Sequence, residues 1–320
     1  MSISTLLPTP SEAMEIIAIA DELFVNSNEW DAILVLENAK RASNLFPTRI
    51  REFFLEFSEK ESSDALIIKL GEFLSNKDIP TPIPYPEECA NYKLNRYQVI
   101  HTVFSSLLGT PIGWSTQRKG SVINNIIPNA SLASIPNSSS GVNYDFGFHT
   151  EDAFHEYKGD YLGLVCIRNN EEAVTRFFSV KNLSLSNEDI AILSEEKFII
   201  KNNPIHETEE FAFSPQSVLY GNKKNPFMRV NFANMHGIDT ISESALNRLK
   251  KSSEVIAESV ILRSGDFFYL DNFYTAHARD AYSTQFNNES RWLSRYIITK
   301  DLRKSAKLRT LESPYVIQVC

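Results

Sequence analysis

An imidazole and a carboxylate stand two positions apart near the middle of this chain, at His149 and Glu151. Alternate side chains of a β-strand point to one face, so a strand here would bring both groups to the same side. Two imidazoles and one carboxylate on one face, with the opposite face open to substrates, form a typical non-heme Fe(II) site. The pair therefore predicts a metal site that needs a second histidine from elsewhere in the chain.

The triplet His149, Thr150 and Glu151 is weak evidence when it is taken alone. With 6 histidines and 40 acidic residues among 320, about one triplet of this kind is expected by chance. The prediction therefore depends on the residues that could complete the site.

The second histidine is predicted at position 277. A short apolar strand over 267–270 ends in a polar exit, Asp271 and Asn272, that leads to His277. A ligand at the end of a rigid strand is held accurately. The helical pattern around His101 favours a packing or surface role, and polar surroundings favour solvated side chains for the remaining three, which are His155, His206 and His236.

Two arginines follow in a segment that has the pattern of a strand. Alternation places Arg291, Leu293 and Arg295 on one face. Two inward guanidinium groups are costly to bury unless each meets a carboxylate in the two-point geometry that arginine provides. The pattern indicates either two carboxylate-bearing ligands or two acidic partners from the protein, and a pair of surface or internally paired arginines fits it equally well.

The composition restricts the class of protein. A hydrophobic content of 42% over 320 residues allows a large core, in one large domain or two modest ones. The net charge of −8 comes without a basic run, which argues against a nucleic-acid partner. Three widely separated cysteines, a first segment unlike a signal peptide and the lack of a membrane-length apolar run favour a cytoplasmic protein without membrane insertion.

Helical patterns dominate the first part of the chain and β-rich patterns the rest. Helices are expected between residues 11 and 60 and over 93–108. Beyond these, many short strands separated by turn residues imply a sandwich or barrel, which one helix over 242–258 interrupts. The expected strands are 121–127, 161–167, 174–180, 197–200, 217–220, 227–232, 260–263, 267–270 and 292–299. The fold class expected is α+β, mainly β, with an N-terminal helical layer.

Two extended strings resemble the clavaminate synthase-like (TauD-related) Fe(II)- and 2-oxoglutarate-dependent dioxygenases, a group that includes hydroxylases of free arginine, asparagine and lysine. One string runs from His149 to Asn169; the other runs from Gly265 to Arg303 and contains Asp271, Asn272, His277, Arg279, Arg291, Trp292 and Arg295. The resemblance covers roughly residues 95–305. Ala278 replaces a glycine that is common after the distal histidine, and Glu289 with Ser290 replaces a frequent Asp-Gly, but neither change removes a ligand.

The resemblance implies a double-stranded β-helix, or jelly-roll, in a single dioxygenase domain over 1–320. The implied parts are a helical layer over about 1–92, a catalytic core over about 93–305 with the insertion 242–258, and a C-terminal tail over 306–320. It further implies Fe(II), 2-oxoglutarate and O2 as cofactor and co-substrates. The implied site consists of the iron ligands His149, Glu151 and His277, the 2-oxoglutarate contacts Arg291 and Thr175, and the amino-acid contacts Arg295, Gln117 and Ser139.

The substrate is expected to be a neutral or amide-bearing L-amino acid, free in solution. Relatives that take cationic amino acids place acids after a Pro-aromatic-x-Arg string like 226–229, where this chain has Asn231 and Ala233. Glu151, Asp239 or another acid could still serve a cation. The implied reaction is hydroxylation of an unactivated carbon, with succinate and CO2 as co-products, because related halogenases lack the carboxylate found at Glu151.

Several alternatives stay open at this stage. The same scaffold could support desaturation or ring formation, and the amino acid could be tethered to a carrier protein. A different class of answer is a non-catalytic jelly-roll binding module, in which His149 and Glu151 only hydrogen-bond a ligand. The polar stretch 202–216 could be a lid over the site or an ordinary surface loop.

Overall fold

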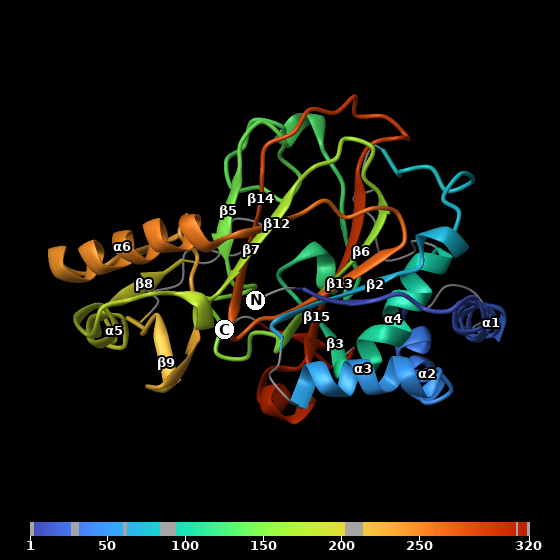
Figure 1. The fold of residues 1–320 in the computed structure, drawn as a ribbon, viewed down its shortest axis with the longest axis horizontal. Coiled ribbons are helices and arrows are strands. Elements are labelled where there is room, and N and C mark those ends of the chain that lie inside the picture. The colour runs from blue at the N-terminus through green and yellow to red at the C-terminus, as the bar shows by residue number, and fades with distance from the viewer. Residues whose placement is uncertain are drawn as a thin grey trace.

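The computed structural model describes residues 3–26, 32–59, 63–83, 94–201, 214–311 and 313–318. Its helices form two groups on opposite sides of the β-strands (Figure 1). One group is α1 (Pro10–Asn26), α2 (Ala32–Ser43), α3 (Thr48–Glu59) and α4 (Arg96–Leu108); the other is α5 (Asn187–Leu193) and α6 (Thr240–Ile256). The N-terminal helical layer is therefore confirmed, and α6 corresponds to the expected insertion.

The strands form two main sheets. The larger has the order β1-β2-β13-β6-β15-β3-β16, with β4 also paired to β15, and the smaller has the order β12-β7-β14-β5. The bounds of the larger sheet are β1 (Ser4–Leu6), β2 (Ala65–Lys69), β13 (Asp266–Asp271), β6 (Tyr161–Arg168), β15 (Trp292–Thr299), β3 (Thr110–Trp114), β16 (Val316–Ile317) and β4 (Asn124–Ile126). Those of the smaller are β12 (Glu258–Val260), β7 (Thr175–Ser179), β14 (Thr275–Arg279) and β5 (Phe146–His149).

Two small antiparallel pairs complete the β-structure. They are β8 (Phe198–Ile200) with β11 (Met235–Gly237), and β9 (Leu219–Asn222) with β10 (Asn225–Met228). The short 3-10 helices are η1 (Gly71–Phe73), η3 (Arg118–Gly120), η4 (Ala130–Leu132), η5 (Val180–Asn182) and η6 (Leu302–Leu308). The arrangement is that of a jelly-roll.

Strand alternation divides the apolar side chains of the larger sheet between two cores. In β6, Val165 and Ile167 pack with the helical layer, whereas Leu164 and Cys166 face the smaller sheet. Such alternation follows from the two-residue period of a strand, and a sheet covered on both faces needs apolar residues in both sets. Leu293 of β15 packs in the same core as Leu164 and Cys166. The inner face of β15 therefore points into the space between the sheets.

Helix α4 anchors the helical layer to the larger sheet. Asn95 caps its first turn reciprocally with Gln98, and Gly109 ends it. Its buried residues include Ile100 and Phe104, which belong to the same core as Tyr269 and Tyr296 of the sheet. The sheet is thereby held from its outer side, and its inner face is left for the site.

Two strands were missed in the segment of about 1–92 that the sequence analysis assigned to the N-terminal helical layer. β2 pairs antiparallel with β13, and β1 pairs parallel with β2 at the edge of the sheet. A short continuous apolar run such as Ala65–Lys69 cannot be distinguished from a helical turn by its periodicity. Near the other terminus, β16 pairs with β3. Both ends of the described chain therefore add strands to the larger sheet.

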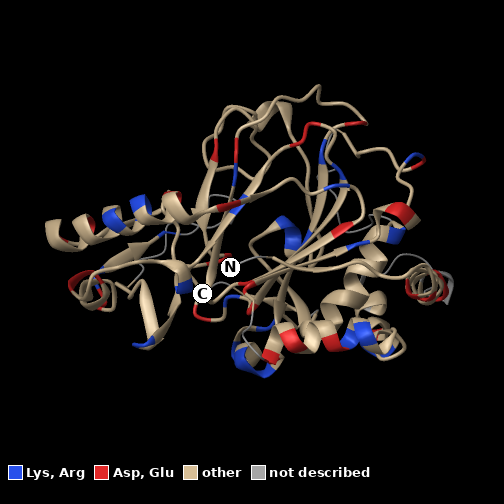
Figure 2. Ribbon diagram, viewed as in Figure 1, with Lys and Arg blue, Asp and Glu red and all other residues tan. Residues whose placement is uncertain are grey.

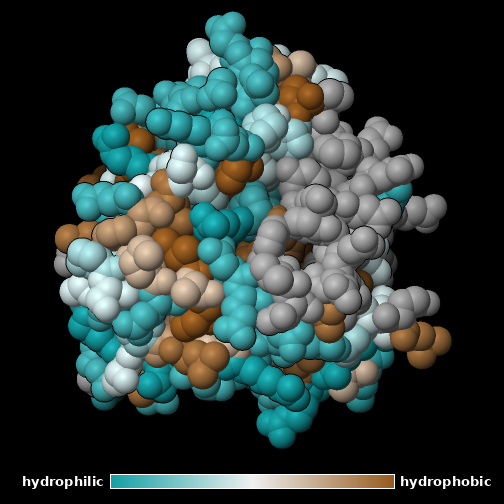
Figure 3. Space-filling model, turned by 90° about the vertical axis from the view of Figure 1, so that its right-hand side faces the viewer, coloured by the Kyte–Doolittle hydropathy of each residue, from teal (hydrophilic) through white to brown (hydrophobic). Residues whose placement is uncertain are grey.

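The surface is mixed in character. Acidic and basic residues alternate along the helices and loops of both sides (Figure 2), and the face on the side of α1 shows apolar groups between polar ones (Figure 3). None of the described helices is long and apolar enough to cross a membrane. The stretch 202–216, interpreted as a lid or a surface loop, lies mostly outside the described residues, as does His206.

His101 is a packing residue of α4. Because it is buried, we expect it to make the free energy of unfolding depend on pH. It is fully buried, no described residue forms a hydrogen bond with either ring nitrogen, and burial lowers its pKa to about 3. Unfolded histidine takes up a proton below about pH 6.5, whereas folded His101 resists protonation until about pH 3, so stability falls as the pH drops through this window. By pH 5 the loss attributable to His101 is about 2 kcal/mol.

His101→Phe should remove this component, so that its free energy of unfolding changes less between pH 7 and pH 5 than that of the wild type, as measured by urea unfolding. His236→Phe is the matched control, because His236 is exposed on β11. Equal pH slopes for His101→Phe and the wild type would contradict the prediction.

Candidate metal centre and adjoining cavities

His149 and His277 lie directly opposite each other on neighbouring antiparallel strands. The register of β14 against β5 pairs the two residues, and their ring centroids are 4.2 Å apart. Residues opposite each other in such a ladder have neighbouring side chains on one face of the sheet. The smaller sheet therefore supplies both imidazoles of the expected site.

The prediction that a shared strand face aligns His149 with Glu151 was wrong. Strand β5 ends at His149, and Glu151 lies in the turn that follows. The next residue, Asp152, has a left-handed backbone with φ of 50°, which is uncommon for residues other than glycine. The turn, and not strand alternation, brings the carboxylate back to the histidines. His277 likewise lies within β14, a strand that was missed, and not at the exit of β13.

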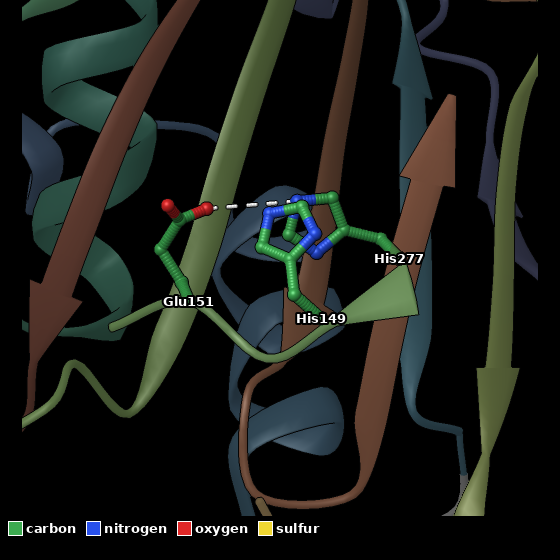
Figure 4. A group of neighbouring side chains, drawn as sticks. All are labelled: His149, Glu151 and His277. Carbon is green, nitrogen blue, oxygen red and sulfur yellow. Dashed lines mark ion pairs between the residues drawn. The ribbon is translucent and has the colours of Figure 1, made fainter. Parts of the chain in front are cut away.

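The three side chains converge on one point (Figure 4). One potential ligand atom from each of His149, Glu151 and His277 lies within 4.8 Å of those of the other two. Glu151 Oε2 is 3.5 Å from His277 Nε2, and it is buried without a hydrogen-bond partner in the part of the chain that the structure describes. Because a buried carboxylate oxygen is costly to leave unpaired, this orphan atom fits a cation between the three groups.

The protonation of the two imidazoles suits metal binding. His149 Nδ1 is 2.9 Å from the carbonyl oxygen of Gly147, which can only accept, so Nδ1 carries the proton and Nε2 is left for a metal. Burial, followed by the neighbouring His149 and Arg295, lowers the pKa of His277 well below its ordinary value. The ring of His277 is thus available in the neutral form that binds metals. The donor set fits Fe(II).

Two cavities meet at this centre. They have volumes of about 400 and 450 Å³, counting space open to solvent, and share the wall formed by Ser139, Phe146, His149, Glu151 and Arg295. The first, called here the Asn231 cavity, also contains Gln117, Asp152 and Asn231. The second, called the Arg291 cavity, also contains Thr175, His277, Arg279 and Arg291. All nine residues expected at the site therefore line one cavity or both.

The Arg291 cavity is positively charged. Its lining holds the three arginines Arg279, Arg291 and Arg295 against the single carboxylate of Glu151. Burial, and then the nearby charge of Arg291, lowers the pKa of Arg279 to about 10. Apolar walls come from Ile126, Leu164 and Leu293. An elongated anion with methylene groups in its middle matches this combination.

Arg291 is the arginine that most clearly lacks a partner. Its side chain is 3% exposed, and the described residues offer its guanidinium neither a hydrogen bond nor an ion pair. Its nearest aromatic neighbour is Tyr282, with the guanidinium 5.6 Å from the ring centroid. The backbone N–H of Arg291 donates to Glu171 Oε1, which fixes the start of β15. A buried guanidinium in this state is expected to bind an anionic ligand.

Arg295 is already paired. Its Nη1 donates to Glu151 Oε1 at 2.6 Å, and its Nη2 donates to Gln117 Oε1 at 3.1 Å. The alternation expected along this strand places Leu293 and Arg295 in the same cavity as Arg291, although the register shifts between Trp292 and Leu293. Of the two explanations for buried arginines, an acidic partner from the protein therefore applies to Arg295, whereas a carboxylate-bearing ligand remains the explanation for Arg291.

Asn231 lies beside the metal centre through a backbone bridge to His149. Its Oδ1 accepts from the N–H of Asn234, which leaves the amide donor for a ligand, since the described residues provide no acceptor for it. Asp152 lines the same cavity, and its carboxylate accepts from Trp114 Nε1 at 2.6 Å. Asp239 lines neither cavity, because it caps α6.

Sequence reasoning noted two residues that support the site, Arg279 and Asn272, but gave them no role. Arg279 shares a strand face with His277, and its guanidinium donates to the carbonyl oxygens of Gly141 and Tyr144 in the loop that carries Ser139. The His-x-Arg spacing on a strand was a signal that could have found it. Asn272 bonds the turn of Glu151, and no local pattern indicates this contact.

No family model matches the chain. The enduracididine beta-hydroxylase of Streptomyces hygroscopicus is 27% identical over 94% of this chain and 95% of that relative. The L-asparagine oxygenase of Streptomyces coelicolor is 23% identical over 90% of this chain and 85% of its own length. The non-heme iron oxygenase OrfP, solved with Fe, succinate and (3S)-hydroxy-L-Arg, superposes with a TM-score of 0.89, 26% identity and coverage of 98% of this chain and 99% of that one.

These likenesses extend over nearly the whole chain and agree with the geometry. OrfP has also been solved with Fe and alpha-ketoglutaric acid, which is 2-oxoglutarate. The cluster of His149, Glu151 and His277 supplies the ligand types that such an iron centre needs. The protein is a 2-oxoglutarate-dependent dioxygenase, and over nearly its whole length it is similar to amino-acid hydroxylases of the clavaminate synthase-like type.

Proposed function

We propose that this protein hydroxylates an unactivated carbon of a free L-amino acid, with 2-oxoglutarate and O2 converted to succinate and CO2. The observation that carries the proposal is the pairing of a two-histidine, one-carboxylate cluster with a cavity in which the guanidinium of buried Arg291 has no hydrogen-bond or ion-pair partner among the described residues. An Fe(II) bound by His149, Glu151 and His277 would supply the oxidising chemistry. The protein's own contribution is placement.

Each cavity is assigned one co-substrate. In the Arg291 cavity, the guanidinium of Arg291 and the hydroxyl of Thr175 would hold the far carboxylate of 2-oxoglutarate, with Leu164 and Leu293 against its methylene groups. In the Asn231 cavity, Arg295 through its Nε, for which the described residues provide no acceptor, and Gln117 would hold the α-carboxylate, and Ser139 would contact the amino acid. Because Glu151 and Arg295 line both cavities, the two ligands would meet at the metal centre.

A neutral, amide-bearing side chain fits the Asn231 cavity best. Asn231 offers an amide N–H donor at the position where an acidic residue would be needed to bind a cationic side chain. Such a donor pairs with the amide carbonyl oxygen of a substrate. A specific observation keeps cationic amino acids as a second candidate, because the carboxylate of Asp152 lines the same cavity. An ionised carboxylate offers two accepting oxygens, and Oδ2 of Asp152 accepts from Trp114 Nε1.

Hydroxylation is preferred to halogenation because Glu151 occupies the position that a halide would need. Desaturation and ring formation would need the same metal ligands as hydroxylation. An amino acid tethered to a carrier protein would also have to reach the Asn231 cavity. The structure of OrfP with (3S)-hydroxy-L-Arg supports a free amino acid as the substrate.

The test is succinate formation by the Fe(II)-loaded protein with a panel of free L-amino acids, each followed by mass spectrometry. Asparagine and glutamine are expected to give the largest succinate yield and a product heavier by one oxygen, and arginine and lysine test the role of Asp152. Loss of two hydrogens would indicate desaturation or ring formation, and a response only to carrier-bound aminoacyl groups would indicate a tethered substrate.

The non-catalytic alternative has its own signature. A binding module would give no succinate above background with any amino acid and no stoichiometric uptake of Fe(II). That pair of results would overturn the proposed function.

A further inference from the structure

The carboxylate ligand Glu151 stands on a turn, and the hydrogen-bond ladder of a strand does not hold it. β5 ends at His149, and the chain then passes through Thr150 and Glu151 into the left-handed Asp152. Metal ligands bind tightly only when other groups hold them in place. Some feature beyond the sheet must therefore fix the backbone of Glu151.

The side chain of Asn272 bonds to both sides of Glu151. Its Oδ1 accepts from the Glu151 N–H at 2.8 Å, and its Nδ2 donates to the Glu151 carbonyl oxygen at 3.1 Å. The same Nδ2 donates to the carbonyl oxygen of Gly159 at 2.8 Å. These three bonds need two donor hydrogens and one acceptor oxygen on the same uncharged side chain. A side-chain amide provides this set, whereas a hydroxyl has only one donor hydrogen.

Asn272 is itself firmly held. It is 2% exposed, its N–H donates to the carbonyl oxygen of Asp160, and its own carbonyl oxygen accepts from Lys158 Nζ at 2.6 Å. It directly follows β13, so it ties the turn of Glu151 to a central strand of the larger sheet. The two histidine ligands come from the smaller sheet, and Asn272 thus links the third ligand to the opposite sheet.

We propose that Asn272 is a positioning residue for the metal centre, which sets metal affinity by fixing the backbone of Glu151. The inference rests on the proposed role of Glu151 as a metal ligand. It assigns no contact between Asn272 and the metal or either substrate, since Asn272 lines neither cavity. Loss of an outer partner of this kind typically lowers metal affinity by about 10- to 100-fold.

Co(II) titration of the metal-free full-length protein, followed by its visible absorption, tests the inference. Asn272→Ala should raise the Co(II) dissociation constant about 10- to 100-fold and alter the absorption band that reports the ligand set. Asn169→Ala is the matched control. Asn169 makes three comparable bonds, with Nδ2 donating to Ala173 and Leu262 and Oδ1 accepting from Ala173, but none to a ligand residue.

A double-mutant cycle separates positioning from general destabilisation. In a Glu151→Ala background, Asn272→Ala should change Co(II) affinity by less than about twofold, because Asn272 acts through Glu151. An undiminished effect in that background, or wild-type affinity in Asn272→Ala, would overturn the inference. If Asn272→Ala does not fold, Asn272→Asp decides alone: it keeps the acceptor for the Glu151 N–H but loses both donated bonds, and wild-type affinity would overturn the inference.

Failure of the two proposals can be told apart. Absence of stoichiometric Co(II) binding by the wild-type protein would overturn the proposed function and this inference together. Tight wild-type binding with no change in the Asn272 variants would overturn this inference and leave the proposed function in place.

Discussion

Replacement of His277 by alanine should reduce Fe(II) affinity by more than about 100-fold, beyond the range typical of outer-sphere changes, and abolish succinate formation. His277 Nε2 faces the orphan Oε2 of Glu151 at 3.5 Å, and no other described imidazole lies across from His149. Removing it leaves two of the three ligand side chains. Equilibrium dialysis against Fe(II) under anaerobic conditions measures the affinity, and succinate release measures turnover.

The stability of the metal-free His277→Ala protein provides the control. Its thermal midpoint should stay near that of the wild type, because the His277 ring is partly exposed at the metal centre and no described residue forms a hydrogen bond with it. His236→Ala, altered at an exposed position of β11, should bind Fe(II) normally. Unchanged iron affinity in His277→Ala would remove His277 from the site.

The identity of the metal ligands could be predicted from the sequence, but the way they are positioned could not. The His-x-Glu spacing suggested one strand, whereas β5 ends at His149 and Glu151 belongs to a turn. The side chain that holds this turn, Asn272, lies far away in the sequence, and hydrogen bonds between distant segments leave no local pattern. His277 was predicted correctly as a neighbour of His149, although it lies on a strand that the pattern did not reveal.

The same limit explains the missed strands of the N-terminal segment. Ala65–Lys69 alternates between the two cores as the other strands of the larger sheet do, with Leu66 and Ile68 toward the helices and Ala65 and Ile67 inward. Because both faces are covered, all four are apolar and the period of two is hidden. By contrast, Arg291 and Arg295 stand at alternate positions on either side of Leu293, and charged groups at this spacing made the inner face of the segment predictable.

Arg291 should be the residue on which recognition of 2-oxoglutarate depends. Arg291→Met is expected to raise the apparent KM for 2-oxoglutarate by at least about 100-fold while Fe(II) affinity stays within about twofold. The physical reason is that a two-point charged contact with the far carboxylate is lost, and each 1.4 kcal/mol of lost binding is a tenfold change. Steady-state succinate kinetics at saturating amino acid and Fe(II) measure the shift.

A shorter comparison uses the co-substrate itself. 2-Oxopentanoate keeps the keto acid and the carbon chain of 2-oxoglutarate but lacks the far carboxylate. The wild type should strongly prefer 2-oxoglutarate, and Arg291→Met should lose most of that preference, because the methionine cannot distinguish the two chain ends. Arg291→Lys should recover only part of it, since an ammonium group offers a single point of contact. An undiminished preference in Arg291→Met would assign the far carboxylate to Arg279 or Arg295 instead.

The metal-free protein provides a second, independent readout. The buried guanidinium of Arg291 forms no ion pair with a described residue, so it destabilises the fold until an anion binds. Arg291→Met should therefore be at least as stable to heat as the wild type when no ligand is added. Added 2-oxoglutarate with a non-oxidisable metal should raise the thermal midpoint of the wild type and leave that of the variant nearly unchanged. A large loss of stability in the ligand-free variant would show that Arg291 holds the fold and not the co-substrate.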